Sequence, residues 1–247
     1  MLVALPPEIA RLALVRLPLA SYPKVVTGLC ARAWAAQNAG AIAEHWAKRK
    51  AARPAIFNGR VLMISQSQQD GDVFRARFFA TDYANLLAWL DWDAPDRSVE
   101  NGFAMGAMTA SDGAFLLGEM GAHTSQAGRI YFPAGTPDLT DVRPDGTVDL
   151  ATSITREIEE ETGLTPADYD VAPDWIVVRI RGYAGLMRSV RLREPAEAAR
   201  ARILAHLRQD ADPELADIRV ARGPSDIDER AMPDYHKAFL RWSFAPV

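Results

Sequence analysis

The segment 156–164, with the sequence REIEEETGL, constrains this chain more than any other. Its four carboxylates fall within five positions at the end of a stretch whose apolar residues repeat with helical spacing. At about 100° per residue, Glu157, Glu160 and Glu161 share one face of the expected helix, and Glu159 points roughly the opposite way. An apolar stripe lies about a quarter turn away, formed by Leu150, Ala151, Ile154 and Ile158. The three carboxylates therefore line the rim of the core on which this helix packs.

Three like charges at positions i, i+3 and i+4 repel one another and destabilise an isolated helix. A hard divalent cation would turn this repulsion into attraction, because Mg²⁺ prefers carboxylate oxygens as ligands. The spacing thus predicts a Mg²⁺ site, with Mn²⁺ as a substitute, on Glu157, Glu160 and Glu161. The alternative is an acidic helix face that is simply solvated, as many are.

The nine residues resemble the core of the Nudix box, R-E-U-x-E-E-x-G-U with U aliphatic, at every specified position. These positions are Arg156, Glu157, Ile158, Glu160, Glu161, Gly163 and Leu164. Upstream, Phe132-Pro133-Ala134-Gly135 is similar to the F-P-G-G that leads into the box in this family.

The spacing between these two motifs departs from the family pattern, G-x5-E-x7-R-E. Counting on six from Gly135 gives Asp141, whereas counting back eight from Arg156 gives Val148, so the loop is seven residues longer here. The first glutamate of the pattern is absent, since Val148 stands in its place with Asp149 beside it. We interpret Asp149 as the N-cap of the acidic helix, because Asp is favoured there.

The resemblance implies an α+β fold, the Nudix α/β/α sandwich with a mixed sheet, over residues 99–247, preceded by an N-terminal α+β extension over residues 1–98. It also implies hydrolysis of a nucleoside diphosphate linked to another group. Glu157, Glu160 and Glu161 would bind the metal, and the Gly135 carbonyl would add a ligand. Arg156 would orient a carboxylate by bidentate pairing rather than contact phosphate. A further acid often comes from downstream, but the candidates Glu194, Glu197, Asp226 and Glu229 are each typical of surface charges or helix caps.

The substrate is suggested by weaker resemblances. The stretch from Phe57-Asn58-Gly59 to Thr81-Asp82-Tyr83 is similar to the N-terminal extension of Nudix proteins that hydrolyse UDP-sugars, and such an extension would cover one end of the substrate cleft. Residues 126–133 partly resemble the segment that precedes the box in CoA diphosphatases, but the expected His is Gln126. A nucleotide-sugar is therefore the first expectation, with CoA or ADP-ribose, or a catalytically silent ligand-binding module, as alternatives. Tyr131, Phe132 and Trp175 could stack a base or belong to the core.

Composition limits the partners of the 247-residue chain. Its net charge of −4 gives no basic footprint, which argues against nucleic acid as a partner. The small-molecule nucleotide substrate is what the resemblance implies. No uncharged apolar run reaches about 18 residues, so no segment is expected to span a membrane. The single cysteine, Cys30, is typical of a reducing, cytoplasmic location. A homodimer is compatible with the sequence.

The hydrophobic pattern predicts the order of the elements. We expect two or three helices over 6–50, and then strands over 55–65 and 73–80 and a short helix over 81–90. A hairpin is expected over 103–119, a short strand over 128–132 and the acidic helix ending at Gly163. Further strands are expected over 175–181 and 186–192, followed by helices over 196–209 and 232–242.

Overall fold

The computed structural model describes residues 8–12, 14–16, 29–124 and 126–245. Its strands are β1 Glu8–Leu12, β2 Leu14–Arg16, β3 Arg60–Asp70, β4 Val73–Asp82, β5 Asn101–Thr109, β6 Phe115–Met120, β7 Ile130–Tyr131, β8 Ala134–Gly135, β9 Tyr169–Val171, β10 Trp175–Ile180, β11 Tyr183–Leu192 and β12 Leu215–Ala221. Its α-helices are α1 Leu29–Gln37, α2 Ala39–Ala52, α3 Tyr83–Asp91, α4 Leu150–Thr162, α5 Ala196–Leu207 and α6 Asp234–Phe244, with 3₁₀ turns η1 Leu139–Asp141 and η2 Pro224–Asp226. The side chain of Cys30 lies outside the described part.

A mixed sheet of nine strands forms the centre of the molecule, in the order β1-β10-β11-β5-β6-β12 with β7, β8 and β9 attached beside it. The pair β5–β11 is parallel and the other pairs are antiparallel. A second sheet of three strands has the order β2-β4-β3. Helices and mixed strands thus combine in an α+β fold, as expected.

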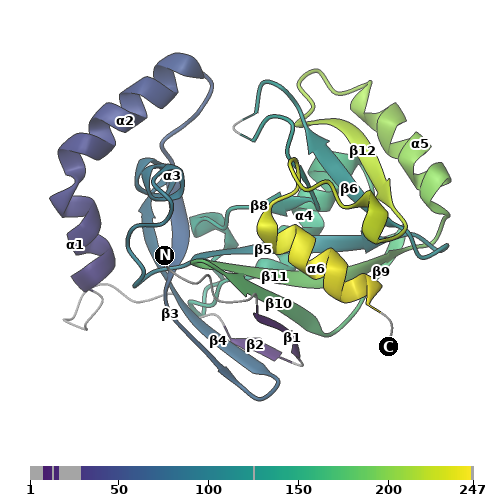
Figure 1. The fold of residues 1–247 in the computed structure, drawn as a ribbon, viewed down its shortest axis with the longest axis horizontal. Helices are drawn as coiled ribbons and strands as arrows, with labels where there is room; N and C mark the ends of the chain where they lie inside the picture. Colours follow the sequence, from purple (N-terminus) through teal and green to yellow (C-terminus); the bar gives the residue numbers. More distant parts are fainter. Residues whose placement is uncertain (1–7, 13, 17–28, 125, 246–247) are drawn as a thin grey trace.

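Helices cover both faces of the central sheet. Along β5, Ala104 and Met108 belong to the core beneath α4 and α5, while Phe103 and Met105 belong to the core beneath α6. This alternation follows from the two-residue period of a strand, which sends successive side chains to opposite faces. Figure 1 shows α6 lying in front of the sheet and α1, α2 and α3 gathered at the opposite end from α5. The α/β/α sandwich is therefore confirmed.

The central sheet opens between β5 and β6. These two strands pair only at Thr109 and Phe115, after which β8 pairs with β5 and β7 pairs with β6. The segment 130–135 consequently crosses from one side of the opening to the other. Its last residue, Gly135, lies opposite Ala104 on the face that α4 covers.

The first described residues differ from the expectation of helices. Residues 8–12 and 14–16 are strands, and helices begin only at Leu29; the expected breaks near Pro18 and Pro23 lie outside the described residues. β1 pairs with β10, more than 160 positions along the chain, and the neighbours Ile9 and Ala10 pack on opposite cores. A partner so distant in sequence overrides local helical periodicity. β9 and β12 were not expected either.

The expected division at residue 98 stays a prediction, and the structure joins the two parts closely. β1 belongs to the central sheet, and in β3 the Leu62 N–H donates to the Pro137 carbonyl at 2.7 Å. Ile64 and Glu100 exchange backbone hydrogen bonds of 2.9 Å. Among the described helices, none has the length and apolar character that crossing a membrane requires.

Candidate functional site

The acidic helix α4 begins and ends as its sequence predicts. Asp149 is the N-cap, and its carboxylate accepts from the Thr152 N–H at 3.2 Å and from the Thr152 hydroxyl at 2.7 Å. The helix ends at Gly163, whose φ of 69° is left-handed. Ile154 and Ile158 are buried against the central sheet, which confirms the apolar stripe. This packing sets the direction in which the glutamates project.

The three glutamates differ in burial. Glu161 is only 6% exposed, Glu157 is half-buried and Glu160 is exposed, while Glu159 on the other face is also exposed, as expected. This gradation places Glu161 and Glu157 beneath the segment that crosses the sheet opening, and Glu160 at the solvent side.

Glu157 and Glu161 contact the two residues of β8. The Ala134 N–H donates to Glu161 Oε1 at 3.3 Å. Gly135 lies so close to Glu157 that a Cβ there would overlap its carboxylate oxygens. Any side chain at position 135 would push Glu157 out of place. The structure therefore brings Gly135, Glu157 and Glu161 together, as the motifs predict.

Arg156 donates to two different carboxylates instead of binding one of them with both nitrogens. Its Nη1 donates to Asp141 Oδ1 at 3.0 Å, and its Nη2 donates to Glu157 Oε1 at 3.0 Å. The expected orienting role agrees with this geometry, but the expected bidentate pairing is wrong, since each carboxylate receives one nitrogen. Asp141 has a side chain only 2% exposed, so Arg156 joins a buried anchor to the half-buried Glu157.

Asp141, which counting from Gly135 reaches, lies at the site, whereas Val148, which counting back from Arg156 reaches, is a buried core residue. Residues 142–148 form a loop whose two ends meet. Val142 and Val148 pair, and the Asp149 N–H donates to the Asp141 carbonyl at 2.7 Å. The seven extra residues therefore loop out between Asp141 and the helix cap. Counting from Gly135, and not back from Arg156, identifies the acidic residue, which is an aspartate in place of a glutamate.

Burial and mutual repulsion dominate the electrostatics of the site. Burial raises the pKa of Glu157, with Glu160 and Glu214 adding to the rise and Arg156 opposing it. Burial raises the pKa of Glu161 well above its ordinary value, and Glu157, Glu214 and Glu160 add to this rise. Carboxylates that raise one another's pKa in this way would be stabilised by a cation among them.

The donors fit a hard cation in kind, although they do not converge in the conformation described. Glu161 Oε2 is buried and has no hydrogen-bond partner, which leaves an oxygen available to a ligand. Within the described residues, no group of three or more His, Cys, Asp or Glu side chains is arranged to hold a metal ion. Glu157 is turned towards Arg156 and Glu160 towards solvent, so rotations of these two side chains would be needed.

Each of the four downstream acids considered from the sequence has a structural role. Glu194 pairs with Arg202 and Glu197 with Arg222, while Glu229 pairs with Arg241. Asp226 accepts from two backbone N–H groups at the start of η2. These findings agree with surface charges and caps.

Glu214 is the acid that sequence reasoning missed. It directly precedes β12, whose pairing with β6 carries it to the carboxylates, and it raises the pKa of Glu157, Glu161 and Tyr131. Its side chain is exposed. No local motif surrounds it, so only the unexpected strand β12 could have indicated its place.

His236 is a second missed residue. Fully buried on α6, it accepts a hydrogen bond at its Nε2 from the Phe132 N–H at 2.9 Å, and so anchors the start of the segment leading to Gly135. Burial lowers the pKa of His236 to about 3, so it is neutral. Phe132 and Trp175 are core residues, which leaves only the half-buried Tyr131 of the three aromatic candidates beside the site.

Comparisons with known proteins give partial likenesses only. No family model matches the chain, and no curated protein matches it. A Nudix hydrolase from M. smegmatis, RenU, is similar over 57% of this chain and 81% of its own, with 15% identity and a TM-score of 0.36. A MutT protein from Methanosarcina mazei Go1 is similar over 58% of this chain and 91% of its own, with 18% identity and a TM-score of 0.37. At these values, the two likenesses do not assign the chain to a family.

Proposed function

We propose that this chain is a Nudix-type hydrolase that cleaves the diphosphate bond of a nucleoside diphosphate linked to another group. Water adds to one phosphorus atom, the bond from that phosphorus to the bridging oxygen breaks, and two phosphomonoesters leave. The single observation that carries the proposal is the meeting of Glu157 and Glu161 with Ala134 and Gly135, because it joins the two separated motifs in one place.

The metal-binding part of the proposal assigns Glu157, Glu160, Glu161 and the Gly135 carbonyl to Mg²⁺, with Mn²⁺ as a substitute. Bound there, the ion would neutralise phosphate oxygens and lower the pKa of a coordinated water. The buried, unpartnered Oε2 of Glu161 supports this assignment.

The remaining residues act on the carboxylates and on protons. Asp141 holds Arg156, and Arg156 holds the Glu157 carboxylate, so this contact fixes the place from which Glu157 would turn towards a cation. Glu214 is the candidate base, since it is exposed, carries charge near Glu157 and Glu161, and has no ion pair among the described residues. It would take the proton of the attacking water.

A nucleotide-sugar, most specifically a UDP-sugar, is the proposed substrate. The stretch from Phe57 to Tyr83, whose resemblance suggests this substrate, has its two ends close together. The Tyr83 N–H donates to the Gly59 carbonyl at 2.9 Å, and the next residue, Ala84, donates its N–H to Asn58 Oδ1 at 2.8 Å. The same region reaches the site through the bond between Leu62 and Pro137, two residues after Gly135. This supports an extension that covers one end of the cleft.

The test is a hydrolysis assay with Mg²⁺ and a panel of UDP-glucose, UDP-galactose, ADP-ribose, CoA, NADH and diadenosine polyphosphates, with products identified by mass spectrometry. Glu160→Gln should abolish turnover with little effect on folding, because Glu160 is exposed. Glu159→Gln is the matched control, since Glu159 is an exposed neighbour on the other face of α4 and should leave turnover unchanged.

Three results would change the proposal. Turnover of CoA or ADP-ribose alone would replace the nucleotide-sugar and keep the enzyme class. Equal activity of Glu160→Gln and wild type would remove the metal assignment. No turnover with Mg²⁺ or Mn²⁺ would favour a catalytically silent ligand-binding module.

A cytoplasmic location and a homodimer belong to the proposal as well, the first resting on the single cysteine.

A further inference from the structure

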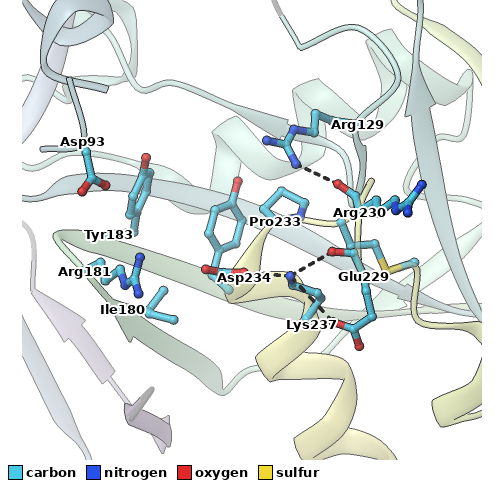
Figure 2. A pocket seen from close by; sticks show the side chains of 12 residues that line it. Asp93, Arg129, Ile180, Arg181, Tyr183, Glu229, Arg230, Pro233, Asp234 and Lys237 are labelled. Atoms are coloured by element: carbon cyan, nitrogen blue, oxygen red, sulfur yellow. Dashed lines mark hydrogen bonds and ion pairs between the residues drawn. The ribbon is translucent and has the colours of Figure 1, made fainter. Parts of the chain in front are cut away.

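A second concave site lies on the α6 side of the central sheet. Its cavity of about 250 Å³ is formed where three segments meet: Asp93 after α3, the turn between β10 and β11, and the residues that open α6. Figure 2 shows Asp93 and Tyr183 on one side of this pocket and Arg129 and Lys237 on the other. Such a volume holds one small chemical group rather than a whole nucleotide.

Four cationic and three acidic side chains line the pocket, an excess of one positive charge in a chain whose net charge is −4. Arg129, Arg181 and Arg230 line it, and none of them has an ion pair among the described residues; Arg129 donates only to the Arg230 carbonyl, at 3.2 Å. The acids Asp234 and Glu229 are already paired, the first with Lys237 at 2.8 Å. Asp93 is the third acid that lines the pocket, and Arg129 and Arg181 lie near enough to Asp234 to lower its pKa. Guanidinium groups that form no direct ion pair keep N–H donors for an oxyanion.

Two tyrosines that line the pocket, Tyr183 and Tyr235, add hydrogen-bond donors. The rings of Tyr183 and Tyr235 lie 5.7 Å apart, and burial raises the pKa of both phenols, so both hydroxyls keep their protons. Arg129 is near enough to oppose these rises. Neutral phenols and guanidinium groups together favour a ligand rich in acceptor oxygens.

Arg181 stands at a position where arginine is unfavourable. It forms with Gly182 the two-residue connection between Ile180 and Tyr183, and both connecting residues have positive φ, 46° and 83°. Hairpin turns of this kind prefer Asn, Asp or Gly at the first position, because other residues are strained there. An arginine kept at such a position is consistent with a role for its side chain.

The pocket is next to the carboxylate site. His236 has ring contacts with Tyr235 at 4.9 Å and with Tyr131 at 5.8 Å. Tyr131 in turn lies near enough to both Glu161 and Tyr235 that each raises its pKa. Tyr131 therefore lies between the carboxylate site and this pocket.

We propose that the pocket around Arg129 and Arg181 binds an oxyanion, a carboxylate or a phosphate, carried by the substrate beyond the diphosphate that is cleaved. The proposal rests on the proposed function, which places that diphosphate at the glutamates of α4. By this proposal, Arg129 and Arg181 determine the specificity for substrates that carry this additional charge over substrates that lack it.

Binding to matched ligand pairs tests the proposal. UDP-glucuronic acid and UDP-glucose differ by a carboxylate, and CoA and 3′-dephospho-CoA differ by a phosphate. Dissociation constants would be measured by calorimetry with Mg²⁺ in the Glu160→Gln background, where turnover does not consume the ligands. In at least one pair the charged member should bind about tenfold more tightly, the size expected of one or two charge-assisted hydrogen bonds.

Arg129→Ala and Arg181→Ala should each reduce that ratio towards one while leaving the less charged ligand within about twofold. Arg208→Ala, an exposed arginine at the end of α5 and outside the pocket, is the control and should leave the ratio unchanged. The pair that shows the effect identifies the oxyanion as carboxylate or phosphate. Ratios near one in both pairs, or ratios that survive both arginine substitutions, would overturn the proposal.

Hydrolysis by the otherwise unchanged protein, followed in parallel, separates this proposal from the proposed function. A charge-dependent ratio without hydrolysis of any ligand would keep the pocket and remove the hydrolase. Hydrolysis without a charge-dependent ratio would do the reverse.

Discussion

Arg156 and Asp141 form an ion pair of 3.0 Å across fifteen positions of sequence, and the carboxylate is almost completely buried. A buried carboxylate needs a partner, and a guanidinium held by one leaves its second nitrogen in a fixed place. That second nitrogen donates to Glu157. The position of a proposed metal ligand thus depends on a residue that the sequence pattern concealed behind a seven-residue insertion.

Replacing Asp141 should impair the site without removing any proposed ligand. We expect Asp141→Asn to reduce the affinity for Mg²⁺ or the rate of hydrolysis by about 10- to 100-fold, the usual effect of losing a group that orients a metal ligand. Titration of activity against Mg²⁺ concentration measures it. Asp141→Glu, which keeps a carboxylate for Arg156, should retain most activity.

The neighbouring Asp149 provides the contrast. Asp149 is the N-cap of α4, and Asn is also a favoured cap. Asp149→Asn should therefore lower the unfolding free energy by at most about 1 kcal/mol and leave the dependence of activity on Mg²⁺ unchanged. If Asp149→Asn weakened Mg²⁺ and Asp141→Asn did not, the assignment of Asp141 to the family's first glutamate would be wrong.

Glu214 should matter for the rate more than for folding. Glu214 is exposed, and its charge acts on Glu157 and Glu161. We therefore expect Glu214→Gln to lower kcat by about 100-fold with an unchanged melting temperature. Glu194→Gln, which removes an acid paired with Arg202 away from the site, should leave kcat as it is. Equal kcat values for all three proteins would exclude Glu214 as the base.

Protonation of His236 should destabilise the fold in acid. The pKa of His236 is about 3 in the folded chain, against 6.5 for an ordinary histidine, so the unfolded state binds the proton more readily. Its contribution to stability is therefore complete above pH 6.5 and is lost as the pH falls towards 3. Between pH 7 and pH 5 the loss should be about 2 kcal/mol.

Urea unfolding at pH 7 and pH 5 measures this loss. His236→Gln removes the titrating ring and keeps an acceptor for the Phe132 N–H, so the change in unfolding free energy between the two pH values should shrink by about 2 kcal/mol. His123→Gln, at an exposed histidine, should not alter it. An unchanged pH dependence in His236→Gln would show that His236 is not neutral in the fold.

Glu161 should destabilise the protein when no cation is bound. Its pKa is raised in the folded state, so ionisation above pH 4.5 opposes folding, and this cost grows as the pH rises. In EDTA at pH 7, Glu161→Gln should therefore increase the melting temperature, by at least about 2–4 °C for each kcal/mol relieved. Mg²⁺ should stabilise the unsubstituted protein and not the variant. A lower melting temperature for Glu161→Gln in EDTA would contradict the role of burial in this site.

The acidic helix and its caps could be predicted from sequence because their signals are local. Asp149, the apolar stripe and Gly163 lie within fifteen residues. The two caps act through hydrogen bonds inside that span, and the stripe is visible as a periodicity within it. The hairpin between β5 and β6, and the strands around Gly71, were predicted within a few residues for the same reason. The α+β class followed from the order of these elements.

Three other features could not be predicted, because each depends on a partner far along the chain. β1 is a strand through β10, and Glu214 reaches the site through the pairing of β12 with β6. Counting in the sequence leaves Asp141 and Val148 as alternatives, and only the contact of Asp141 with Arg156 decides between them. Side-chain roles that arise from such pairings leave no trace in local composition.

The pairing of β1 with β10 has a practical consequence for anyone who wishes to express residues 99–247 alone. A protein cut at residue 99 would lose residues 8–12, and β10, with the sequence WIVVRI, would become an open edge. Unpaired apolar edges of this kind join to other chains, and the product is aggregate rather than a smaller enzyme. Residues 8–12 thus occupy the edge of β10 and prevent this strand from pairing with another molecule.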